Sequence, residues 1–199
     1  MQIYLVRHGE TVWNKEEIFR GRRDVSLNEA GRRQADLTGR YFLNKGIARI
    51  FASPLRRAFE TAEAVSKPTK TPIEITDALT DMDFGAWEGL ELKEAEQLYP
   101  EELSLWITSP QRFRAKGGES LRDIQRRAKK GLQKMMSEGE GPIVLVTHRV
   151  LCKIIVLLCL RIPSSHFWEI RCDPASISLI ERRGRSTTLS FLNDTCHLQ

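Results

Sequence analysis

The run from residue 3 to residue 11 constrains this chain more than any other segment. Ile3-Tyr4-Leu5-Val6 has the pattern of a buried strand, and the strand ends abruptly in Arg7-His8-Gly9. Backbone geometry then brings an arginine and a histidine to one edge of a sheet, where α/β proteins place their chemistry. A histidine there can act as a base, a metal ligand or a nucleophile. The permanent charge of Arg7 favours a nucleophile directed at phosphate.

Short apolar runs alternate with helix signals along the chain. Buried strands are expected at 3–6, 50–52 and 143–146. Helices are expected after them, over 29–44 with Asn28 as N-cap, from a Ser53 cap and Pro54 onward, and over 150–160. Strands that alternate with helices indicate βαβ units. The prediction is a three-layer α/β/α sandwich with a mostly parallel central sheet.

The remaining segments fit around this sheet. A further strand is expected at 73–75, a helix to about 137 with Ser120 as its N-cap, and an edge hairpin from 176–180 and 187–191. Between 78 and 118 the pattern loosens into short helices near 91–98 and 101–108, which indicates a small helical excursion over the active site. Because nothing in the composition marks a break, residues 1–199 are expected to form one domain.

Composition narrows the class of protein. The 31 Lys and Arg against 26 Asp and Glu give a net charge of +5, a modest excess without the aromatic interleaving of nucleic-acid binders. No apolar stretch is long enough to span a membrane, and the first strand is not a signal peptide. The cysteines at 152, 159, 172 and 196 lack zinc spacing and are expected to be core thiols of a reducing compartment. We therefore expect a cytoplasmic protein without metal, nucleic-acid or membrane partners.

Cationic residues follow all three predicted parallel strands. Arg7-His8 follows the first, Arg57 lies in the first helical turn after the second, and His148 follows the third. Helix N-termini add further positive potential at the same edge. Such a concentration of positive charge is costly when nothing balances it, and a tetrahedral oxyanion would balance it.

Six motifs occur in order, and together they resemble the histidine phosphatase superfamily, in its phosphoglycerate mutase-like branch. They are Arg7-His8-Gly9-Glu10-Thr11, Trp13-Asn14, Ser53-Pro54-Leu55-Arg56-Arg57-Ala58, Phe84-Gly85-Ala86-Trp87-Glu88-Gly89, Gly117-Gly118-Glu119-Ser120 and Thr147-His148.

The resemblance implies a covalent mechanism without a cofactor, in which His8 attacks phosphorus and becomes a phosphohistidine. Arg7, Arg57 and His148 would hold the phosphoryl oxygens, and Asn14 would add a neutral donor. The spacing within the motif selects Arg57 over its neighbour Arg56. The second nitrogen of His8 should donate to a carbonyl or carboxylate that fixes its tautomer.

The acid that protonates the leaving group is expected at Asp81. Family members place a glutamate in a Leu-x-Glu pattern at this point, and this chain has Leu79-Thr80-Asp81. The shorter side chain reaches about 1.5 Å less far, so Asp83, Glu88 and Glu119 remain alternatives. Arg149 is a second departure, because family members usually carry a small residue there. It either points to solvent or offers charge to a bulky anionic substrate.

Packing is the expected role of the tryptophans at 87, 106 and 168, although Trp87 could border the leaving-group pocket. His166 and His197 lack motif context. Glu119 is also expected to brace the loop before the 120–137 helix.

The residues of these motifs resemble those of small bacterial phosphatases, including α-ribazole phosphatases and broad-specificity or phosphoserine phosphatases. The mutase-type Glu-Arg-His-Tyr-Gly run is absent from the position of the acid. We therefore expect metal-independent hydrolysis of a small phosphomonoester, either α-ribazole 5'-phosphate or a broad set of substrates. The alternatives are a cofactor-dependent phosphoglycerate mutase and a phosphate-binding regulatory pseudoenzyme. A monomer and a homodimer both remain open.

Overall fold

The central sheet has the predicted mostly parallel arrangement. The structure is a computed structural model that describes residues 1–16, 18–184 and 186–199. Six strands lie in the order β3-β2-β4-β1-β5-β6. Their bounds are β1 Gln2–Arg7, β2 Arg49–Ala52, β3 Ile73–Ile75, β4 Ile143–Thr147, β5 Ile177–Arg183 and β6 Ser186–Asp194.

Strand β1 lies inside the sheet and pairs on both sides. It runs parallel to β4, with Arg7 opposite Thr147, and antiparallel to β5. Strands β2 and β3 extend the parallel half, and β5 and β6 form the edge hairpin. The carboxyl ends of β1, β2 and β4 therefore meet at one edge, which places residues that follow these strands close together.

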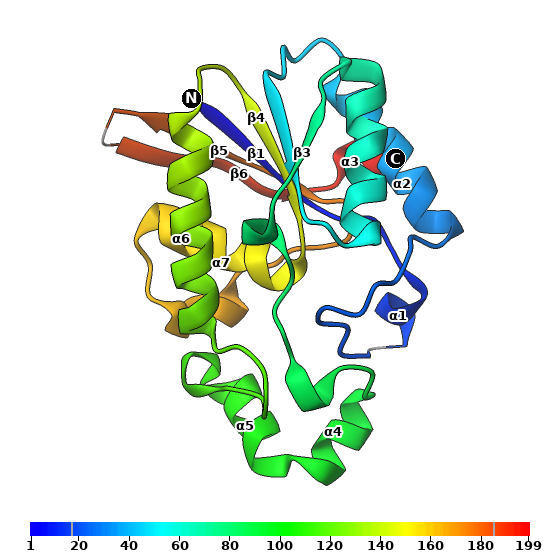
Figure 1. Cartoon of the computed structure of the whole chain (residues 1–199), viewed down its shortest axis with the longest axis vertical. Helices are drawn as coiled ribbons and strands as arrows, with labels where there is room; N and C mark the ends of the chain where they lie inside the picture. The colour runs from blue at the N-terminus through cyan, green and yellow to red at the C-terminus, as the bar shows by residue number, and fades with distance from the viewer. Residues whose placement is uncertain (17, 185) are drawn as a thin grey trace.

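Alternating side chains of β1 supply two cores. Tyr4 and Val6 belong to the cluster under α2 (Glu29–Phe42) and α3 (Arg56–Thr69). Ile3 and Leu5 belong to the cluster under α6 (Leu121–Ser137) and α7 (Arg149–Leu160). Figure 1 shows these helix pairs on opposite sides of the sheet, so the predicted three-layer sandwich is confirmed.

Two helix starts follow their predicted caps. The Asn28 side chain accepts a hydrogen bond from the Gly31 N–H at the start of α2, and Ser120 does the same for Asp123 in α6. The Ser53 cap is wrong, because α3 begins at Arg56 and has no side-chain cap. Ser53 is instead fully buried.

The segment expected to form the excursion lies beyond the carboxyl ends of the parallel strands (Figure 1). It contains α4 (Leu92–Leu98) and α5 (Pro100–Thr108), with the short 3-10 helices η1 (Asp77–Leu79), η2 (Gly85–Trp87) and η3 (Pro110–Arg112). Trp87 is fully buried at its centre, where it packs on Phe19 and Phe113 and donates its indole N–H to Glu102. A packing role for Trp87 is confirmed.

Shorter elements complete the chain. They are α1 (Val12–Lys15), η4 (Ser164–Glu169) and η5 (Cys196–Leu198). All four cysteines are free thiols, as expected, but Cys196 is exposed rather than in the core. Within the described residues, no helix is long and apolar enough to cross a membrane.

Gly39 permits the close crossing of α2 and α3. A Cβ atom at Gly39 would stand 2.0 Å from the Ala64 carbonyl oxygen of α3. Replacing glycine by alanine inside a helix usually stabilises it by about 1 kcal/mol. Here the clash with backbone should win, because overpacking costs about 1–3 kcal/mol.

We predict that Gly39→Ala lowers the free energy of unfolding, measured by urea denaturation, whereas the exposed control Arg40→Ala changes it by less than about 0.5 kcal/mol. A stabilised Gly39→Ala variant would contradict this view of the helix crossing.

Candidate functional site

The side chains predicted for the site converge at the carboxyl ends of β1, β2 and β4. Arg7, His8, Arg57, Asp81 and His148 are all buried, with exposed fractions of 0–6%. The His8 and His148 rings lie 5.2 Å apart between centroids. The sheet thus brings together groups that are up to 141 positions apart in the sequence, since 148 − 7 = 141.

His8 is held in one tautomer. Its Nδ1 lies 2.7 Å from the Gly9 carbonyl oxygen, which can only accept, so the proton is on Nδ1. The Nε2 lone pair is then available for reaction. The carbonyl partner expected for this histidine is therefore Gly9.

Burial keeps His8 neutral. The pKa of His8 lies well below its usual value of 6.5, first because of burial and then because of the charges of Arg57, Arg7 and Arg20. The backbone hydrogen bond to Gly9 opposes this shift without reversing it. A neutral imidazole surrounded by arginines has the protonation state that a nucleophile needs.

Backbone carbonyl groups hold the guanidinium groups of Arg7 and Arg57 in place. Arg57 donates from Nη1 to the Arg23 carbonyl and from Nη2 to the Gly21 carbonyl, both at 2.8 Å. Arg7 donates from Nη1 to the Cys172 carbonyl at 2.6 Å. The buried Nε atoms of Arg7 and Arg57 have no hydrogen-bond partner among the described residues. These N–H groups suit an anion.

Gly21 allows the loop at 20–23 to approach Arg57. It has φ +50°, and a Cβ atom there would stand 2.0 Å from the Glu88 Oε1 atom. Glu88 in turn accepts the backbone N–H of Arg22 at 2.7 Å. A glycine at position 21 is therefore required by both its backbone conformation and its surroundings.

Asp81 bridges Arg57 and His148. Its Oδ2 lies 3.1 Å from Arg57 Nη2 and 3.6 Å from His148 Nδ1. Its Oδ1 accepts the Met82 N–H at 2.9 Å. Asp81 is thus the carboxylate beside the cationic cluster.

His148 has a partner that sequence reasoning missed. Its Nε2 lies 2.8 Å from Ser53 Oγ, and its Nδ1 is buried without a hydrogen bond, facing Asp81. The pKa of His148 is also well below 6.5, because of burial and then the charge of Arg57. Ser53 was assigned to a cap because serine before proline is typical of a helix start; only the position of β4 beside β2 shows its contact with His148.

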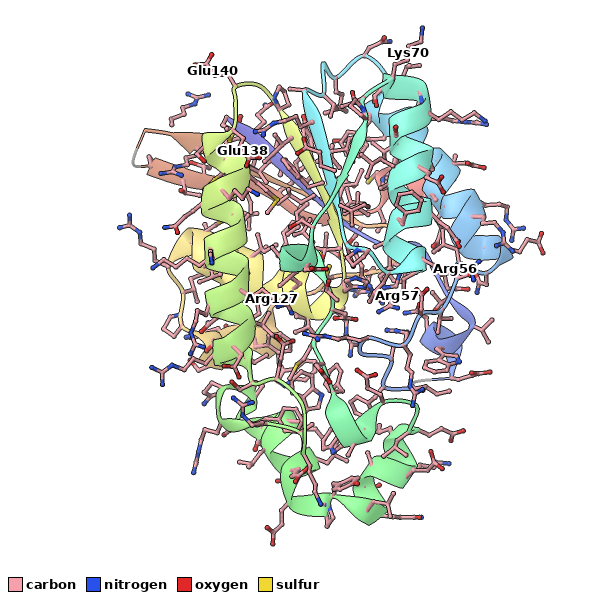
Figure 2. All side chains as sticks on the ribbon, in the orientation of Figure 1. Arg56, Arg57, Lys70, Arg127, Glu138 and Glu140 are labelled. Atoms are coloured by element: carbon pink, nitrogen blue, oxygen red, sulfur yellow. The ribbon has the colours of Figure 1, made fainter. Side chains whose placement is uncertain are left out.

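Arg127 of α6 holds the backbone of the segment that carries Asp81. It donates to the carbonyls of Asp77, Ala78, Thr80 and Asp81 at 2.7–3.3 Å. In Figure 2, Arg127 and Arg57 lie on either side of this segment. Glu119 accepts from Arg127 at 3.1 Å and orients the guanidinium.

The alternative acids are engaged elsewhere. Glu119 accepts from Arg127 and from the Asp83 N–H, which confirms its bracing role. Asp83 accepts the Gly85 N–H and lies 3.6 Å from Arg22. Glu88 holds Arg22 and Phe84 by their backbone N–H groups. Within the described residues, none of the three lies within ion-pair distance of Arg57, His8 or His148.

A cavity of about 440 Å³ opens onto this cluster. Arg7 and Asp81 line one part of it, with Glu10, Asn14, Arg20 and Arg149 as further polar residues. Its apolar lining comes from Trp13, Ile18, Phe19, Phe84, Leu92, Trp106, Ile107, Val150, Trp168 and Pro174. Trp106 and Trp168 thus border the cavity, whereas Trp87 is not among the lining residues.

Three polar residues of the cavity lining can each supply a positive or hydrogen-bond-donating group. The Asn14 Oδ1 accepts from the Thr11 N–H and hydroxyl, both at 2.9 Å, so its amide nitrogen is the atom that can donate to a ligand. Arg20, which none of the sequence motifs includes, also borders the cavity; its pKa is lowered to about 9 by burial and then by the charge of Arg7. Arg149 borders the cavity rather than pointing only to solvent.

The other two histidines lie outside the cluster. His166 is partly exposed and contacts Glu169, and His197 contacts Thr38. No group of three or more His, Cys, Asp or Glu residues suited to a metal ion occurs in the described part of the chain.

Comparisons with known proteins identify the family and its relatives. A family model described as the histidine phosphatase superfamily (branch 1) matches residues 3–195. Phosphoserine phosphatase 1 of Hydrogenobacter thermophilus is 31% identical over 100% of this chain and 94% of its own length. Bacillus stearothermophilus YhfR superimposes with a TM-score of 0.94 at 31% identity, covering 100% of this chain and 99% of that chain. The α-ribazole phosphatase of Shigella flexneri superimposes with a TM-score of 0.90 at 25% identity, over 98% and 96% of the two chains.

Neutral, buried histidines predict a loss of stability in acid. In the unfolded chain His8 has a pKa of about 6.5, whereas in the folded chain its pKa is well below this value. Between pH 7 and pH 5 the unfolded chain therefore binds a proton that the folded chain does not, so the free energy of unfolding falls as pH falls.

We expect His8 to account for about 2 kcal/mol of this fall, measured by urea denaturation of the native chain and of His8→Asn at both pH values. An equal fall in the two proteins, or a His8 resonance that titrates between pH 5 and 7 in the folded state, would contradict the neutral assignment.

Proposed function

This chain belongs to the histidine phosphatase superfamily, and we propose that it hydrolyses small phosphomonoesters by transferring the phosphoryl group first to His8 and then to water. That it is a phosphomonoester hydrolase of the histidine phosphatase type follows from the family and from its phosphatase relatives. The observation that carries the proposed mechanism is the neutral His8, with Nδ1 bound to the Gly9 carbonyl and Nε2 available among arginines.

In the first step the His8 Nε2 lone pair attacks phosphorus in line. A nitrogen–phosphorus bond forms and the bond from phosphorus to the ester oxygen breaks. The Nδ1–H bond to Gly9 keeps the ring oriented and stabilises the positive charge that develops on the imidazole. The alkoxide leaves with the electron pair of the broken bond.

Arg7, Arg57 and His148 stabilise the phosphoryl oxygens. Carbonyl oxygens already hold both guanidinium groups in place, so little reorganisation is needed when the charge moves. His148 can donate from Nδ1 while Nε2 accepts from the Ser53 hydroxyl. Asn14 and Arg20 add donors at the cavity side.

Asp81 supplies the proton to the leaving oxygen. In the structure its carboxylate pairs with Arg57. When phosphoryl oxygens take over Arg57, Asp81 loses a cationic neighbour and gains an anionic one, and both changes favour its protonated form. In the second step the same carboxylate accepts a proton from the attacking water, which releases phosphate and restores His8.

The cavity favours leaving groups that are small and partly apolar. Its walls carry aromatic side chains from the excursion and from η4, including Trp106 and Trp168. α-Ribazole 5'-phosphate and a broader set of small esters are the substrates that we propose to test. We also propose that residues 1–199 act as one catalytic domain whose 78–118 segment covers the site. The arginines supply the positive charge, so no step requires a metal ion.

We predict that His8→Ala lowers phosphate release from a panel of phosphomonoesters by at least about 1,000-fold, in the presence of a chelator. His166→Ala is the matched control and should retain activity, because His166 is partly exposed and lies outside the cavity. Phosphate release measured by a colorimetric assay, with trapping of an acid-labile phosphoprotein, tests this.

Other outcomes would redirect the assignment. Phosphate binding without turnover by the native chain would favour a regulatory pseudoenzyme. Transfer to an added phosphoglycerate that exceeds transfer to water would favour the mutase.

We predict that Asp81→Asn lowers kcat/KM for an alkyl phosphate about 100-fold or more, but lowers that for p-nitrophenyl phosphate far less, because p-nitrophenolate leaves without a proton. Asp83→Asn is the matched control and should show no such dependence on the leaving group. Equal losses with both esters in Asp81→Asn would assign the acid elsewhere.

A further inference from the structure

Arg149 is the first residue of α7 and borders the cavity beside the buried cluster. It follows His148 directly in sequence, and Val150 after it also lines the cavity. Trp106 and Trp168 line the same space. Arg149 therefore lies on the substrate side of the sheet edge, next to apolar walls that would surround a leaving group.

Within residues 1–16, 18–184 and 186–199, no carboxylate forms an ion pair with Arg149. Among the residues that the structure describes, it takes part in no ion pair or hydrogen bond. Its charge instead acts on other cations: it adds to the effect of burial in lowering the pKa of Arg7 and of Arg20. Like charges that act on one another in this way are unfavourable until an anion joins them.

A second cation lies one turn along α7. Lys153 is 5% exposed, and its Nζ lies 4.4 Å from the Trp168 ring centroid and 4.7 Å from that of Phe167. Burial first, and then the charge of Arg149, lower the pKa of Lys153 to about 8. This cation–π contact holds the Lys153 ammonium group against Trp168. Of these two cations, Arg149 is the one that lines the cavity.

The phosphoryl group does not need Arg149. Arg7, Arg57 and His148 already surround the phosphoryl position, and Asp81 marks the side from which the leaving group departs. Among the described side chains that line the cavity there are three arginines, at positions 7, 20 and 149, and two carboxylates, at positions 10 and 81. Asp81 pairs with the buried Arg57 rather than with a lining arginine. Arg149 thus adds positive charge to the cavity that Asp81 does not pair with.

We infer that Arg149 forms a second anion subsite, which binds a carboxylate or a second phosphate carried by the leaving group of the ester. This inference rests on the proposed function for its substrate, because it assumes that the phosphoryl group occupies the His8 site. The enzyme would then prefer esters with two anionic groups over esters with one.

Binding to a variant that cannot turn over tests the subsite directly. In His8→Ala, calorimetry should show that 3-phosphoglycerate binds about 10- to 100-fold more tightly than glycerol 3-phosphate, the range expected for a charge-assisted hydrogen bond. Adding Arg149→Gln should remove this difference, whereas Arg33→Gln, an exposed arginine of α2 paired with Glu29, should leave it unchanged.

Kinetics on the otherwise native chain give a second measurement. Arg149→Gln should lower kcat/KM for 3-phosphoglycerate by the same 10- to 100-fold and leave p-nitrophenyl phosphate within about twofold. The same comparison is made with fructose 1,6-bisphosphate and fructose 6-phosphate. It shows whether Arg149 binds a second phosphate as well as a carboxylate.

The outcomes separate this inference from the proposed function. If Arg149→Gln lowered kcat/KM equally for esters with one and with two anionic groups, Arg149 would contact the phosphoryl group. If it lowered kcat/KM for neither, Arg149 would not bind the substrate. Either result overturns the subsite. Failure of the native chain to release phosphate from any ester would overturn the proposed function, while the calorimetric difference would still report on Arg149.

Discussion

Burying two arginines beside two histidines at one sheet edge is the physical constraint around which the site is built. Arg7 and Arg57 are held by backbone carbonyls of two separate segments, at Cys172 and in the loop at 20–23, and their charges help to keep His8 and His148 neutral. A buried cation without a counterion is costly. Asp81 supplies one counter-charge, and in the proposed mechanism the phosphate of the substrate supplies the rest.

In the proposed mechanism, Asp81 and the substrate compete for Arg57. The contact between Asp81 and Arg57 is present in the structure, so phosphate that binds Arg57 in this mechanism changes the surroundings of the proposed acid. Asp81 can change partner without losing its position because Arg127 holds the backbone on either side of it. Arg127 of α6 thus holds the proposed acid through its backbone, and no contact between Arg127 and the Asp81 carboxylate is found among the described residues.

Sequence reasoning was most successful where residues follow strands. The positions of Arg7, His8 and His148 depend on local alternation and on the strand ends, and Arg57 on a helix beginning near Ser53. It was less successful where a polar residue has two possible roles. Ser53 resembles a cap, yet it contacts His148; Arg20 resembles a solvated charge, yet it borders the cavity; and Trp87, near Asp81 in sequence, belongs to the core of the excursion.

The sequence by itself determined the layered α/β class, the sheet edge that carries the chemistry, and the family, because strand periodicity and short motifs are local properties of the chain. The tertiary structure decided which carboxylate faces the cations, which carbonyl fixes the His8 tautomer, and that Arg149 borders the cavity. These depend on contacts between segments far apart in sequence, such as Asp81 with Arg57 and His148 with Ser53, whose distances only the packing of strands and loops determines.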